Sequence, residues 1–166
     1  MTQTDIVGTV REHEGAAVVH MEARYPTDIS DLWSAITEPE RLARWIAEVS
    51  GDLRVGGSFS ATFTSTWSGT GQVVVCQPPH RLLVATDGGD GDIGEIEATL
   101  TEDGDHTLLV VEQRGIALSQ GPLYGAGWEV HLEDLALHVA GEPAGDWRAR
   151  WAELSPAYLA RGLDVG

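Results

Sequence analysis

The stretch that decides the fold is PLYGAGWEVHLEDLALHVAG at residues 122–141, which has the pattern of one long amphipathic helix. Proline is typical of a first helical turn and glycine of the position after the last, so we predict a helix from Pro122 to about Ala140. Its apolar residues occupy an arc of about 100°, wide enough to lie on a curved sheet. The arc contains Tyr124, Trp128, His131, Leu132, Leu135 and Val139.

Upstream of this helix, short runs alternate between apolar and polar residues, which is typical of β-strands. Val19, Met21, Ala23 and Tyr25 share one face of such a run, opposite His20 and other polar side chains. The separators are short and rich in Gly, Pro and Asp, so we predict an antiparallel meander of six or seven strands. The predicted strands span residues 6–11, 17–25, 58–64, 71–77, 81–86, 93–100 and 107–114.

Two short helices are predicted after the first strands, at residues 28–36 and 39–46. Thr27 or Asp28 can cap the first, and TEPE at 37–40 has the form of a capping box with proline in the first turn. This element order predicts an α+β fold in which a curved antiparallel β-sheet wraps around the long C-terminal helix. At 166 residues, we expect one domain over 1–166, with a core at about 16–140 and a helical extension at 145–166.

The C-terminal extension is predicted to cover a second apolar stripe of the long helix. That stripe consists of Leu123, Val130 and Leu137, which the sheet cannot also contact. Helical spacing in the extension is shown by Trp147, Trp151 and Leu154, before Ser155-Pro156 restarts a final turn. We predict that the extension docks on the stripe or against a second copy of the chain, as a homodimer.

Composition excludes several functional classes. Twenty-six acidic residues against 10 basic ones give a formal charge of -16, which repels nucleic acid and anionic membrane surfaces. All ten basic residues are arginine, so a P-loop lysine and a Schiff-base lysine are excluded. Cys76 is the one cysteine, which excludes an internal disulfide and a multi-cysteine metal centre. With no apolar run of membrane-spanning length and no secretory signal, we expect a cytoplasmic protein.

Several short motifs follow one another in a characteristic order. They are LW at 32–33, AITEPE at 35–40, LARWI at 42–46, DLRVGGSF at 52–59, QPPHRL at 77–82 and GAGW at 125–128. With the element order, they resemble the SRPBCC or START-like superfamily of helix-grip proteins, over roughly residues 16–140. Within it, the chain most resembles the homologues of the activator of the heat-shock chaperone ATPase. It departs from them by lacking a tryptophan at 83–86 and by having Gln113 where a histidine is common.

The resemblance implies a cavity between the long helix and the concave sheet, which holds a small hydrophobic molecule without a cofactor. Its predicted ligand-binding residues are Phe59, Phe63 and Trp67 from the sheet with Tyr124, Trp128, His131 and Leu135 from the helix. The alternative is a solid core filled by the same side chains.

Two other functions stay open. A cyclase- or aromatase-like enzyme would use His131, Tyr124 or Glu112 for proton transfer, whereas a chaperone co-factor would act through its surface. His131, Asp134 and His138 share one edge of the predicted helix. The two histidines lie about 10.5 Å apart along the helix axis, a long reach for one ion, so we predict no metal site.

Overall fold

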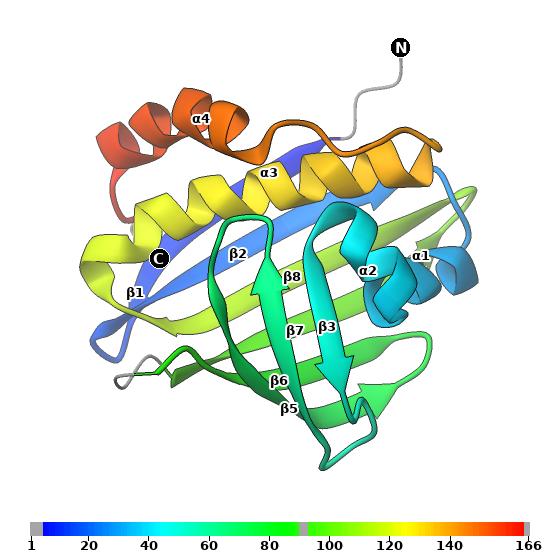
Figure 1. The fold of residues 1–166 in the computed structure, drawn as a ribbon. Helices are drawn as coiled ribbons and strands as arrows, with labels where there is room; N and C mark the ends of the chain where they lie inside the picture. The colour runs from blue at the N-terminus through cyan, green and yellow to red at the C-terminus, as the bar shows by residue number, and fades with distance from the viewer. Residues whose placement is uncertain (1–4, 90–92, 165–166) are drawn as a thin grey trace.

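The computed structural model describes residues 5–89 and 93–164. Within these ranges, eight strands form one curved antiparallel sheet, helix α3 (Gly121–Val139) lies across its concave face, and α4 (Trp147–Arg161) runs beside α3 (Figure 1). The strands are β1 (Ile6–His13), β2 (Ala16–Tyr25), β3 (Ala47–Gly51), β4 (Ser58–Phe63), β5 (Ser68–Gln77), β6 (Arg81–Asp87), β7 (Ile93–Asp103) and β8 (His106–Ile116). Helices α1 (Ile29–Thr37) and α2 (Pro39–Trp45) follow β2, and a 3-10 turn, η1 (Leu118–Gln120), precedes α3.

The sheet order is β1-β2-β8-β7-β6-β5-β4-β3, so β3 to β8 form a continuous meander and β8 closes against β2. This confirms the predicted helix-grip fold. The sheet has one strand more than predicted, because β3 is a five-residue edge strand, AEVSG, too short to show an alternating pattern. It is nevertheless in register with β4, where Val49 lies opposite Ala61.

The two short helices form where predicted, but only one of the two predicted caps forms. The Asp28 carboxylate accepts a 2.8 Å hydrogen bond from the Asp31 backbone N–H and so caps α1. The capping box expected for α2 is absent, since the Thr37 hydroxyl donates instead to the Trp33 carbonyl at 2.7 Å. Glu38 is the residue before α2, and its side chain makes no capping bond.

Helix α3 contacts the sheet through the predicted arc, in which Trp128, Leu132 and Leu135 are buried. The Tyr25 hydroxyl on β2 donates a 2.8 Å hydrogen bond to the Leu132 carbonyl. Gly125 permits a close approach on another side of the helix, because a Cβ there would lie only 2.7 Å from a methyl carbon of Val10 on β1. A side chain at this position would therefore push the helix off β1.

Helix α4 docks on α3 as predicted. The Trp151 indole N–H donates to the Leu123 carbonyl at 3.0 Å, and the Arg150 guanidinium makes two 2.8 Å hydrogen bonds to the Glu133 carboxylate. Coverage of the predicted stripe is incomplete, since Leu137 remains 37% exposed. These contacts involve no position of α3 beyond Glu133, so the last turn of α3 is left without cover from α4.

The predicted break at Ser155-Pro156 is wrong, because α4 continues through Pro156 to Arg161. Pro156 cannot donate a hydrogen bond to the Ala152 carbonyl, but Ala152 is exposed and water can take that place. The Ser155 hydroxyl also donates to the Trp151 carbonyl at 2.6 Å. Among the described residues, none of the helices has both the length and the apolar composition that crossing a bilayer demands.

Candidate functional site

A pocket of about 450 Å³ opens where the turn joining β4 to β5 meets α3 and the first turns of α4. Figure 1 shows this turn curling up toward the middle of α3. Six aromatic side chains line the pocket: Phe63, Trp67, Tyr124, Trp128, Trp147 and Trp151. These rings come from the end of β4 and the turn after it, from α3 and from α4, which are three separate segments of the sequence, so the pocket exists only in the folded chain.

A second pocket of about 180 Å³ continues from the first toward α2 and β3. The two share a wall made of Phe63, Trp67, Thr86, Ile96 and Trp128. The inner pocket is almost entirely apolar and includes Phe59, whose ring lies directly over Gly71. A Cβ at position 71 would lie 2.4 Å from that ring, so glycine makes room for it.

The structure brings most of the predicted lining residues together. The outer pocket is lined by five of them: Phe63, Trp67, Tyr124, Trp128 and His131. Phe59 lines the inner pocket but not the outer one.

Leu135, in contrast, lines neither pocket. It is fully buried in the core cluster that also contains Tyr25 and Leu32. The core is therefore closed at Leu135, and the predicted cavity occupies only the part of the arc before it.

His131 is enclosed by aromatic rings. Its ring centroid lies 5.8 Å from that of Phe63, 5.6 Å from that of Trp128 and 5.5 Å from that of Trp147. Only 4% of the residue is exposed, and within the described residues its Nδ1 has no hydrogen-bond partner. Burial lowers the pKa of His131 to about 3, so the imidazole is neutral at pH 7.

Gln113 and Glu112 are neighbours on β8 but lie on opposite faces of the sheet. Gln113 faces the outer pocket, where its Oε1 accepts a 2.6 Å hydrogen bond from the Trp128 indole N–H and fixes that ring. Glu112 faces away from α3 and bonds to His20 at 2.8 Å and Arg114 at 3.0 Å. Glu112 is therefore not a pocket residue, since successive side chains of a strand alternate between faces.

His131, Asp134 and His138 share an edge of α3, but their side chains do not converge on one point. The Arg41 Nε–H donates to His138 Nε2 at 3.0 Å, and the Gly145 backbone N–H donates to Asp134 Oδ1 at 3.1 Å. Burial, with Glu133 adding a smaller effect, raises the pKa of Asp134 to about 6. In residues 5–89 and 93–164, no group of three His, Cys, Asp or Glu side chains is placed to hold a metal ion.

The sequence analysis missed the contribution of α4 to the pocket. Trp147 and Trp151 were predicted only to cover α3, yet they also form the outer wall of the pocket, with Arg148 between them. Their rings are stacked, with centroids 5.8 Å apart. Helical spacing could predict that they share a face, but no local pattern shows that this face borders a pocket.

Comparison with known proteins places this geometry in a family. Residues 26–140 match the family described as Activator of Hsp90 ATPase homolog 1-like protein. The chain belongs to this family. The match ends before α4, so the family region supplies α3 and most of the sheet, whereas Trp147, Arg148 and Trp151 lie beyond it. No curated protein matches the chain.

Solved structures show the same fold as this member of the activator-homologue family. The crystal structure of CalU16 from Micromonospora echinospora is 28% identical with a TM-score of 0.76, covering 96% of this chain and 98% of CalU16. DynU16, a protein in the dynemicin biosynthetic locus, is 27% identical with a TM-score of 0.71, covering 78% of this chain and 50% of DynU16. PFC0360w, an HSP90 activator from Plasmodium falciparum, is 23% identical with a TM-score of 0.50, covering 60% of this chain and 73% of that protein.

Proposed function

We propose that this protein binds a small hydrophobic or aromatic molecule in the outer pocket, without a cofactor and without converting it. The observation that carries the proposal is the aromatic pocket of about 450 Å³ with its apolar continuation of about 180 Å³. Small-molecule sites typically measure about 300–1,000 Å³ and are mostly apolar with a few polar groups. Tryptophan walls supply a large contact area at low cost in conformational entropy.

One relative supports a small molecule as the ligand. DynU16, which is 27% identical to this chain, is a protein in the dynemicin biosynthetic locus. A protein of a biosynthetic locus acts in the company of small organic compounds. This setting agrees with an aromatic pocket better than with a flat docking surface.

The chemistry of the pocket favours binding over acid–base catalysis. A general base works best with a pKa near the working pH, whereas the pKa of His131 is about 3. Glu112, the carboxylate that the enzyme alternative would use, faces the other side of the sheet. Asp and Glu are absent from the described lining of both pockets, so no carboxylate is placed to take over the role.

A filled pocket tests the proposal. Thr86 lies in the wall between the two pockets, so Thr86→Phe should fill the space that the ligand needs. Thr62→Phe is the matched control, because Thr62 is exposed on β4, two strands away from Thr86 on β6, and lines neither pocket. Native mass spectrometry of protein purified from its own cells should show a bound small molecule on the wild type and on Thr62→Phe, but not on Thr86→Phe. Wild-type protein without any bound compound, or Thr86→Phe that retains it, would contradict the proposal.

A chaperone co-factor is the second candidate, and the family description favours it. This function would act through the surface of the molecule, so it should survive filling of the pocket. Stimulation of a heat-shock chaperone ATPase by the wild type and equally by Thr86→Phe would support the co-factor function. No stimulation by either protein would leave ligand binding as the better account.

A further inference from the structure

We infer that the ligand of the outer pocket is an aromatic or hydrophobic acid whose carboxylate pairs with Arg148 at the pocket mouth. This inference rests on the proposed function and adds the chemical class of the ligand. Three observations support it: the charge of the pocket lining, the absence of an acidic partner for Arg148 among the described residues, and the unpaired buried polar atoms of two other lining residues.

The charge of the pocket lining is opposite to that of the whole chain. Acidic residues outnumber basic ones by 26 to 10, yet among the described residues that line the outer pocket Arg148 is the one ionic side chain and none is Asp or Glu. The chain as a whole repels anions. The pocket mouth is therefore a place where an anion meets a cation without meeting a carboxylate.

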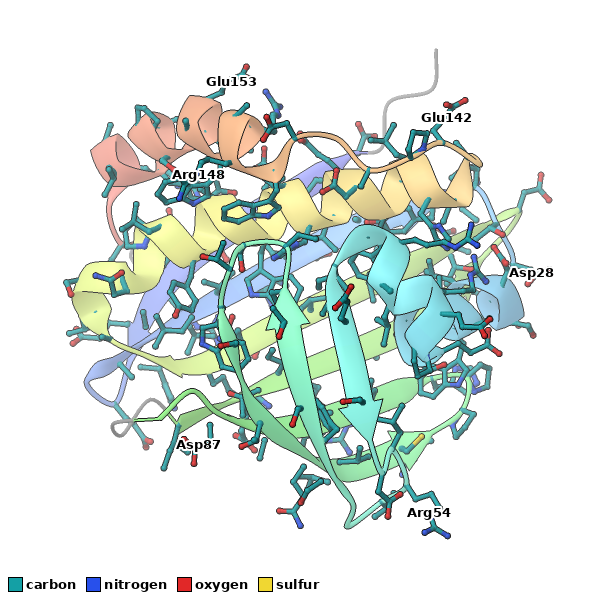
Figure 2. All side chains as sticks on the ribbon, viewed as in Figure 1. Asp28, Arg54, Asp87, Glu142, Arg148 and Glu153 are labelled. Carbon is teal, nitrogen blue, oxygen red and sulfur yellow. The ribbon has the colours of Figure 1, made fainter. Side chains whose placement is uncertain are left out.

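Arg148 has no acidic partner of its own. Eight arginines form ion pairs with Asp or Glu side chains. The Arg148 side chain is exposed and makes no ion pair or hydrogen bond with any residue of the described ranges, although Arg150, two residues further along α4, pairs with both Glu133 and Glu153. Figure 2 shows Arg148 where α4 borders α3. Its guanidinium is free to take a carboxylate, which it can bind through two parallel hydrogen bonds.

Two residues that line the same pocket as Arg148 each have a buried polar atom without a partner. The indole Nε1 of Trp147 and the Nδ1 of His131 are buried and make no hydrogen bond within the described part of the chain, and the two rings lie 5.5 Å apart. Buried polar atoms are usually paired, and an indole N–H can only donate. Trp147 therefore needs an acceptor, which an oxygen atom of the ligand would supply.

A cationic or neutral ligand fits these features less well. Aromatic walls can stabilise a cation, but here it would face Arg148 and find no carboxylate in the lining. A neutral aromatic compound would fill the pocket and leave Arg148 without a role. An acid uses the aromatic walls, the guanidinium and the indole N–H together.

Three probes of similar size and different charge test the inference: naphthoate, naphthamide and naphthylmethylammonium. Their dissociation constants are measured by tryptophan fluorescence on the wild type, Arg148→Gln and Arg148→Lys. Arg44→Gln is the matched control, because Arg44 is exposed on α2, forms no ion pair among the described residues and does not line the pocket. It removes the same charge at a distance from the site.

The wild type should bind naphthoate more tightly than naphthamide, and Arg148→Gln should weaken naphthoate binding by about threefold to tenfold without changing naphthamide binding. Arg148→Lys should retain part of the preference for naphthoate over naphthamide, and Arg44→Gln should retain all of it. Added salt should weaken naphthoate binding to the wild type. Equal binding of naphthoate to the wild type and Arg148→Gln, or tightest binding of the ammonium probe, would overturn the inference alone. Failure of all three probes to bind the wild type would overturn the proposed function as well.

Discussion

Protonation of Asp134 should stabilise the protein as the pH falls from about 6 to 4, and Asp134→Asn should abolish this effect. Only 4% of Asp134 is exposed, its Oδ1 accepts the Gly145 backbone N–H at 3.1 Å, and its Oδ2 has no partner in the described residues. Burial of the carboxylate raises its pKa from 3.8 to about 6. The carboxylate is thus held in a site that favours the protonated form.

The direction of the effect follows from proton binding. Between pH 3.8 and about 6, the folded protein keeps the Asp134 proton, whereas the unfolded chain releases it. The free energy of unfolding contributed by this group therefore falls as the pH rises through that window and is constant above it. The full difference between the Asp134 pKa values of the folded and unfolded chains corresponds to about 3 kcal/mol in the free energy of unfolding. The neighbouring linker residue Gly145 is exposed, so water screens the site and we expect about 1–2 kcal/mol.

The assay is urea unfolding followed by tryptophan fluorescence at several pH values between 4 and 7.5. Asparagine at position 134 keeps an acceptor for the Gly145 N–H but carries no titratable group. Glu142→Gln is the control, because Glu142 projects from the same linker into solvent (Figure 2) and loses the same charge. Between pH 4 and 7.5, the free energy of unfolding of the wild type should fall by about 1–2 kcal/mol relative to that of Asp134→Asn. A difference that does not change with pH would refute the reasoning.

Three further predictions follow from the packing of α3, α4 and β2. Gly125→Ala should destabilise the protein by about 1–3 kcal/mol in urea unfolding, because the added methyl group overlaps Val10. Trp151→Phe should cost about 1–2 kcal/mol in the same assay, since the ring can still stack but the hydrogen bond to the Leu123 carbonyl is lost. Burial lowers the pKa of His20, but its hydrogen bonds to Glu112 and Glu22 raise the pKa by more, so that the pKa lies above its ordinary value of 6.5. The stability from His20 should be present below its ordinary pKa and lost as the pH rises through its raised pKa, and His20→Gln should remove that dependence.

The fold could be predicted from local patterns because each major element carries its own signal. Alternation in 17–25 gives β2 and its buried face, and the spacing from Tyr124 to Val139 gives α3 and its side toward the sheet. Where the sequence pattern is weak, or where the outcome depends on contacts with other segments, the prediction was wrong or the element was missed. The edge strand β3 is too short for a pattern, and the Thr37 hydroxyl bonded to Trp33 instead of capping α2.

The candidate site could be predicted only in part, for a different physical reason. Periodicity shows that Trp128, His131 and Leu135 share a face of α3, but it does not show where the core closes along that face. Leu135 lies in the closed part, whereas His131 lies at the pocket. Which side chains border empty space is decided by packing between distant segments, and that information is not local.

The walls of the pocket come from two kinds of sequence, and this division has a consequence for ligand choice. The inner pocket and the α3 wall lie within residues 26–140, which match the family, whereas Trp147, Arg148 and Trp151 lie beyond that range. A fold determines a cavity, but the few polar groups at its mouth determine what the cavity accepts. In this protein the exposed guanidinium of Arg148 lies at the mouth, and the buried indole N–H of Trp147 belongs to another lining residue, both on α4. The region shared with the family therefore accounts for a hydrophobic cavity, and the segment after it for a preference for an acidic ligand.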